Sequence, residues 1–131
     1  MKKESELNTE LFIKSIIEVV HKSSISDVNS VLNKKPPGRG RQEKALELHN
    51  WYLNLDEKSK VNIADVIEQS VHASIFGFLA TLDGSRGIED GDKEGEFKLT
   101  YKNTDGTFDL SKAMDLHDEY QAQIYNKVFG K

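Results

Sequence analysis

Residues 61–82 read VNIADVIEQSVHASIFGFLATL, and this stretch decides the fold. Its apolar side chains recur at spacings of three and four residues, which is the period of one helical face. From Ser70 to Leu82 the stretch has no Asp, Glu, Lys or Arg, so we expect this half of the helix to be buried on most sides and to form the centre of the core. Asp56 precedes the helix and is well placed to cap its first turn.

The helix leads into a loop rich in glycine and acidic residues, and a hairpin follows. Phe97, Leu99 and Tyr101 alternate with polar residues from residue 96 on, which is the period of a half-buried strand. Residues 103–106, Asn-Thr-Asp-Gly, predict a tight turn, and residues 107–110 predict the returning strand. Because an isolated hairpin is only marginally stable, we expect its apolar face to rest on the central helix.

Helical spacing also predicts helices over residues 7–20, 41–55 and 111–129, with Ser5 or Asn8 as the first N-cap. The sequence therefore predicts an α+β fold that is predominantly α. We expect about four helices and one C-terminal β-hairpin packed on the central apolar helix.

The length of 131 residues predicts a single domain. Residues 1–22 form its N-terminal helix and residues 41–131 its main body. The serines and Asp27 within residues 23–27 predict a break, with only a weak turn of helix from there to Leu32. Residues 33–40 contain Pro, Gly and basic residues and predict a non-helical linker.

Composition excludes several classes of function. The chain has no Cys, which excludes disulfides, thiolate zinc sites and cysteine nucleophiles. The N-terminal residues carry acids where a secretory signal is apolar, and no apolar run approaches membrane-spanning length. We expect a cytoplasmic protein with no membrane partner.

Two loops carry opposite charge. Residues 34–41 hold four basic residues and no acid, whereas residues 83–96 hold six acids against Arg86 and Lys93. Pro37 to Arg41 is similar to the core of an AT-hook, but four basic residues are too few for strong phosphate binding by an acidic protein. We therefore do not expect nucleic acid as a partner. An acidic loop instead predicts a basic protein partner.

Metal and catalytic motifs are incomplete. Glu18 and His21 have the Glu-x-x-His spacing of carboxylate-bridged bundles, but no second copy exists. His117 is followed at the helical spacing by Gln121 rather than by a second His. Tyr101 stands where a calcium loop requires Glu, and no phosphate loop or nucleophile setting is present. The sequence predicts no catalytic residue, no metal and no cofactor.

The remaining candidates are binding residues. Arg86 can make a bidentate contact with a carboxylate, either inside its own loop or on an acidic partner. We expect an ion pair inside the loop, with Asp83 or Glu89, which holds the loop closed. Tyr101, Trp51 or Tyr52, if exposed, supplies the aromatic anchor that binding usually needs. The predicted binding residues are Asp83, Arg86, Glu89, Asp90, Trp51 and Tyr101.

Several stretches resemble a group of small uncharacterised bacterial proteins. They are residues 50–52 with Leu55, 70–73, 76–79, 82–86 with 88–90, and 95–99, and the resemblance covers about residues 45–131. It implies a bacterial cytoplasmic origin and a common fold, and it carries no established activity. Some small acidic bacterial proteins are immunity proteins that neutralise a toxin, which is an analogy of size and charge alone.

The leading hypothesis is a non-enzymatic protein-binding module that uses the acidic loop 83–96. An immunity-like protein is one form of this hypothesis. The alternative is a small-ligand-binding protein or an enzyme with an anion pocket around Arg86 and with Asp83 or Glu89 as acid or base. A third hypothesis is a homodimer formed through the small residues at 73, 77 and 80 or through the hairpin edge. A flat acidic face favours the binding module, and a deep pocket with a buried carboxylate favours the enzyme.

Overall fold

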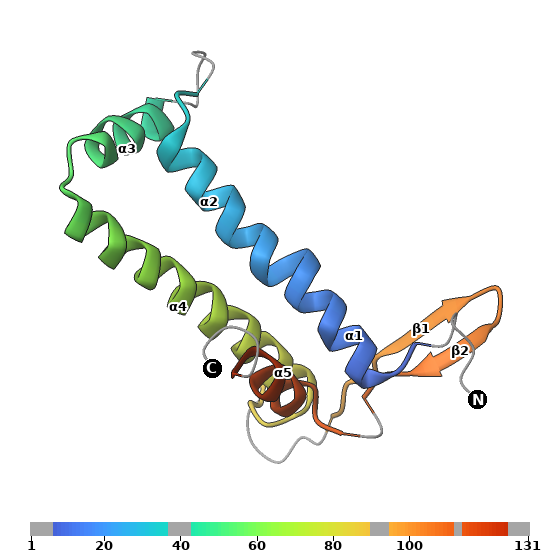
Figure 1. Cartoon of the computed structure of the whole chain (residues 1–131). Coiled ribbons are helices and arrows are strands. Elements are labelled where there is room, and N and C mark those ends of the chain that lie inside the picture. The colour runs from blue at the N-terminus through green and yellow to red at the C-terminus, as the bar shows by residue number, and fades with distance from the viewer. Residues whose placement is uncertain (1–6, 37–42, 90–94, 112–113, 126–131) are drawn as a thin grey trace. The chain divides into compact units, whose positions relative to one another are not determined.

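The computed structural model describes residues 7–36, 43–89, 95–111 and 114–125 (Figure 1). The chain falls into two compact units, and each is described by itself. The first unit combines residues 1–20 with 73–131, and the second consists of residues 21–72. The described residues are mostly helical with one antiparallel hairpin, which confirms the predicted α+β fold. The predicted single domain stays a prediction.

The N-terminal helical segment is longer than the sequence predicts. Helix α1 (Thr9–Ile16) continues directly into the π-helix η1 (Ile17–Lys22) and then into α2 (Ser23–Asn33). The break predicted at residues 23–27 is therefore wrong. Serine and aspartate have only modest helix penalties, and the contact of α2 with the next helix outweighs them. Asn8 is the N-cap of α1, as predicted, because its side chain accepts a hydrogen bond of 2.8 Å from the Leu11 N–H.

The next two helices confirm the sequence prediction. Helix α3 (Glu43–Leu53) packs against α2 in the second unit, and α4 spans Glu57–Leu82. Asp56 caps α4, since its carboxylate accepts a 3.1 Å hydrogen bond from the Ser59 N–H. Hydrogen bonds from the side chain and the backbone of Ser59 lower the pKa of Asp56 below its usual value.

The core of the first unit joins α1, η1, the end of α4 and α5 (Leu116–Ile124). Its six side chains are all buried, and they are Ile13, Ile17, Leu79, Leu116, Tyr120 and Ile124. The α4 helix buries only one side here, because Phe78 is 64% exposed. The expectation that this half of the helix is buried on most sides is therefore wrong. In the first unit too few elements surround α4 to cover its whole circumference.

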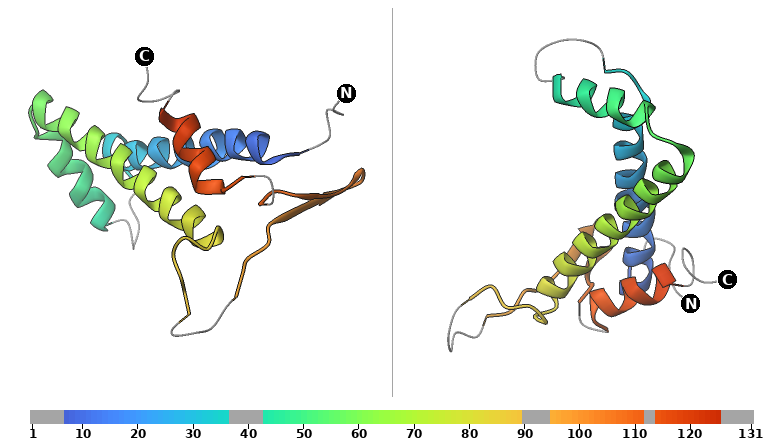
Figure 2. Two further views of the ribbon diagram at one scale, coloured as in Figure 1. Left: turned by 90° about the horizontal axis from the view of Figure 1, so that it is seen from below. Right: turned by 90° about the vertical axis from the view of Figure 1, so that its left-hand side faces the viewer.

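The hairpin consists of β1 (Thr100–Asn103) and β2 (Gly106–Asp109), with Tyr101 opposite Phe108. It extends away from α5 (Figure 2), and the predicted turn is confirmed. The first strand begins at Thr100 rather than at residue 96, and Tyr101 is exposed.

The base of the hairpin carries its contacts with the rest of the first unit. Leu99 packs against the core and Leu110 is buried. The Thr9 hydroxyl donates a 2.7 Å hydrogen bond to the Leu110 carbonyl oxygen, and the Leu110 N–H donates to the Leu99 carbonyl at 2.8 Å. The hairpin is thus held to α1 and the core at its base rather than along the whole apolar face.

The last helix begins five residues later than predicted, at Leu116 instead of Ser111. Its predicted end at residue 129 lies outside the described residues. Within the part of the chain that the structure describes, no helix is long and apolar enough to cross a membrane.

The core assignment predicts the effect of a truncation in α1. Ile13→Ala removes a fully buried side chain and is expected to lower the free energy of unfolding by about 2–5 kcal/mol, measured by urea denaturation. Leu11→Ala is the matched control, because Leu11 lies in the same helix and is 40% exposed. Its cost is expected to stay below about 1 kcal/mol. Equal losses for the two variants would contradict the described core.

Candidate functional site

Asp83 connects the end of α4 to the start of α5. It follows the last residue of α4, and its side chain is 1% exposed. One carboxylate oxygen accepts the Leu116 N–H at 2.9 Å, and the other accepts the His117 N–H at 2.7 Å. These amides belong to the first turn of α5, where helical N–H groups lack partners within the helix. Asp83 therefore caps α5 from a different segment of the chain.

The same carboxylate fixes the ring of His117. The Nδ1 of His117 lies 2.5 Å from Asp83 Oδ2. An ionised carboxylate only accepts hydrogen bonds, so Nδ1 is the donor and carries the proton. The ring also packs edge-on against Phe76, with the ring centroids 5.3 Å apart. The Nε2 atom points to Asp118, whose Oδ1 is 3.3 Å away.

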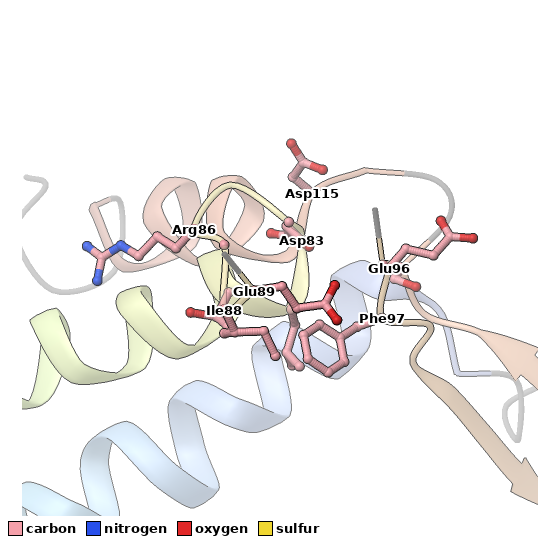
Figure 3. Close-up of a pocket in the computed structure, with 13 residues that line it drawn as sticks. Asp83, Arg86, Ile88, Glu89, Glu96, Phe97 and Asp115 are labelled. Atoms are coloured by element: carbon pink, nitrogen blue, oxygen red, sulfur yellow. The ribbon is translucent and has the colours of Figure 1, made fainter. Parts of the chain in front are cut away.

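A hollow of about 610 Å³ lies beside Asp83 (Figure 3). Its wall combines the end of α4, the loop after it and the segment that leads into the hairpin. The lining residues are Thr81, Leu82, Asp83, Gly84, Arg86, Gly87, Ile88, Glu89, Gly95, Glu96, Phe97, Ser111 and Asp115. Four of these are carboxylates and one is a guanidinium, so the described lining is acidic. Ile88 and Phe97 add an apolar surface that is 69% and 45% exposed.

Arg86 does not close the loop by the predicted ion pair. Among the described residues it forms no salt bridge, and Figure 3 shows its side chain pointing away from Asp83 and Glu89. Asp83 is instead occupied by α5. The Arg86 guanidinium lies against Gly77 of α4, where an added Cβ atom would come within 2.7 Å of Nη1. The close approach depends on the absence of a side chain at Gly77.

This contact also bears on the predicted dimer surface. Gly77 and Ala80 are buried, whereas Ala73 is exposed, so the chain itself covers only part of the small-residue face of α4. A homodimer through this face or through the hairpin edge stays a prediction.

The predicted binding residues separate into three groups. Asp83, Arg86 and Glu89 line the hollow. Tyr101 is exposed on β1 outside the lining, and Trp51 is exposed on α3 in the second unit. The sixth residue, Asp90, lies outside the described residues.

Sequence reasoning missed Phe97, Asp115 and His117 as site residues. Phe97 has the alternation of a strand residue that faces the core, yet it precedes β1 and lines the hollow. The run Asp115 to Asp118 lies inside the predicted helix 111–129, and its acids are typical of a helix N-terminus. Its partner Asp83 is more than thirty residues away, and no local pattern reveals such a pairing.

The described contacts of three histidines are made with different partners. In the second unit, His21 Nε2 lies 2.9 Å from Glu68 Oε2, and His49 Nδ1 lies 2.8 Å from the Leu32 carbonyl oxygen. His117 belongs to the first unit with Asp83. The described residues do bring together one group with the chemistry of metal ligands, namely Asp115, His117 and Asp118.

Comparison with known proteins adds no assignment. No protein-family model, no curated protein and no solved structure matches the chain. The resemblance over about residues 45–131 therefore stays a prediction, and function is argued from the geometry of the chain's own residues.

The geometry predicts the cost of removing the Asp83 carboxylate. Asp83→Ala leaves two amides and one imidazole without their acceptor, and it is expected to lower the free energy of unfolding by about 3–5 kcal/mol. The measurement is urea denaturation followed by circular dichroism. Asp105→Ala, at an exposed acid of the hairpin turn, is the matched control and is expected to change stability by less than about 0.5 kcal/mol. A loss at Asp83 no larger than at Asp105 would contradict the capping role.

Proposed function

We propose that the chain is a non-enzymatic protein-binding module and that a basic side chain of the partner enters the acidic hollow. The observation that carries the proposal is the charge of the lining. Glu89, Glu96 and Asp115 are exposed carboxylates around one hollow, and Arg86, the cation of the described lining, is directed along α4. A site of this charge attracts cations and repels anions.

The carboxylates are largely available to a partner. Asp83 is occupied by α5, but no described residue pairs with Glu89 or Asp115 in the hollow. Glu96 lies 3.9 Å from Lys98, and both side chains are mostly exposed. Ion pairs of this kind contribute little, so Lys98 competes weakly with a basic side chain from a partner. Complementary charge of this sort raises the rate of association and selects the partner.

The apolar part of the lining supplies contact area. Ile88 and Phe97 are exposed side by side with carboxylates. Exposed large apolar side chains at a hollow are typical of interaction sites. An arginine from the partner can place its planar guanidinium on an aromatic ring while its nitrogens bond a carboxylate. The combination of Phe97 with Glu89 and Glu96 suits such a residue.

The anion-pocket alternative has less support. It requires the Arg86 guanidinium to be free for an anion, and although Arg86 lines the hollow, its guanidinium lies against Gly77. It also requires a free acid or base, and Asp83 is committed to three hydrogen bonds with α5. The predicted bacterial and cytoplasmic setting agrees with an immunity-like module whose basic partner is a toxin. That form of the proposal rests on size and charge.

The proposal predicts a loss of binding when the hollow loses charge. The full chain is immobilised, a basic partner is captured from bacterial lysate, and the purified pair is measured by surface plasmon resonance. The double variant Glu89→Gln/Glu96→Gln is expected to slow association by about tenfold at low salt, and by less as salt screens the charges.

The matched control removes the same two charges elsewhere on the first unit. Glu10→Gln/Asp105→Asn changes exposed acids outside the lining and is expected to associate at the wild-type rate within about twofold. Equal slowing by both double variants would show that net charge alone acts. Unchanged binding by the hollow variant, or an acidic partner, would contradict the proposal.

A further inference from the structure

We propose that Asp115, His117 and Asp118 bind a zinc ion at the first turn of α5. One ligand atom from each residue lies within 4.8 Å of the other two. The three residues combine one imidazole with two carboxylates, which are ordinary zinc ligands. This inference goes beyond protein binding; it shares Asp115 with the hollow but does not use Glu89 or Glu96.

The imidazole is already oriented as a metal ligand. Asp83 lies outside the three-residue cluster, is buried, and accepts from His117 Nδ1 at 2.5 Å. In a neutral ring with its proton at Nδ1, the lone pair is on Nε2, on the side of Asp118. A zinc-binding histidine usually donates a hydrogen bond to a carboxylate from the ring nitrogen that does not bind the metal. This hydrogen bond fixes the tautomer and the orientation of the ring.

The spacing of Nε2 and Asp118 also fits an ion. When the ring is neutral, Nε2 and the carboxylate Oδ1 are both acceptors, and they lie 3.3 Å apart. A contact between two acceptors is favourable only when a positive centre is shared between them. Zinc–ligand bonds of about 2.0–2.1 Å in a tetrahedral arrangement separate neighbouring ligand atoms by about 3.3 Å.

The carboxylate of Asp115 is not used to cap α5. It occupies the N-cap position of α5, where aspartate usually bonds the first amides, but its side chain makes no capping hydrogen bond. Asp83 takes that role for Leu116 and His117. Asp115 is exposed and lines the hollow, so an ion can reach it from solvent.

Charge and ligand type favour zinc over other common divalent ions. A helix N-terminus ordinarily disfavours a cation, but the Asp83 carboxylate offsets the positive end of α5. Two carboxylates and a neutral imidazole balance the charge of a divalent ion. The imidazole selects against magnesium and calcium, which prefer oxygen ligands alone. Three protein ligands leave a fourth position for water or for a group of a partner.

The test is isothermal titration calorimetry of zinc chloride into the untagged, chelator-treated full chain. We expect one ion per chain with micromolar or tighter affinity. Asp118→Asn and Asp115→Asn, each at an exposed residue, are expected to weaken binding by about tenfold or more while circular dichroism stays that of the wild type. Asp105→Asn is the matched control and is expected to bind as the wild type does. Cobalt(II) in place of zinc is expected to show the visible absorption of a low-symmetry, tetrahedral site.

Two results would overturn the proposal. One is the absence of one-to-one zinc binding in the wild type. The other is binding that survives in both Asp variants and is lost in His49→Asn or His72→Asn, which would place the ion elsewhere. Glu89→Gln/Glu96→Gln is expected to keep its zinc affinity, so failure of the partner-binding proposal is measured separately.

Discussion

A buried carboxylate satisfies the start of one helix from the end of another, and the site depends on this contact. Asp83 would be costly to bury without partners, and the first amides of α5 would be costly to leave unbonded. The carboxylate accepts hydrogen bonds from both amides, at 2.9 Å from the Leu116 nitrogen and 2.7 Å from the His117 nitrogen. The contact fixes α5 against the end of α4.

Both proposals follow from that use of Asp83. Because its carboxylate is committed to α5, Asp83 does not hold Arg86, whose guanidinium lies on Gly77 instead. The hollow therefore keeps an acidic lining that attracts a basic partner. Because Asp83 also replaces the N-cap residue, the carboxylate of Asp115 is left over beside His117. The contact of Asp83 with α5 thus leaves carboxylates available both in the acidic hollow and beside His117.

Local sequence patterns predicted the helices and the turn better than they predicted which distant residues contact one another. The helix ending at Leu82 and the turn at residues 103–106 were predicted correctly, because helical periodicity and turn chemistry act between near neighbours. The break at residues 23–27 was predicted wrongly, since packing of α2 against α3 outweighs weak local preference. The predicted ion pair between Arg86 and Asp83 is wrong for a related reason. The true partner of Asp83 lies 34 residues away, beyond any local pattern.

The most direct measurement is amide hydrogen exchange at Leu116 and His117 by NMR. Amides at the first turn of a helix normally exchange quickly, because they have no acceptor within the helix. If Asp83 accepts both, their exchange is expected to be slowed as much as that of amides inside α5, and Asp83→Asn should speed both by about tenfold or more. Fast exchange at both amides in the wild-type chain would contradict the account.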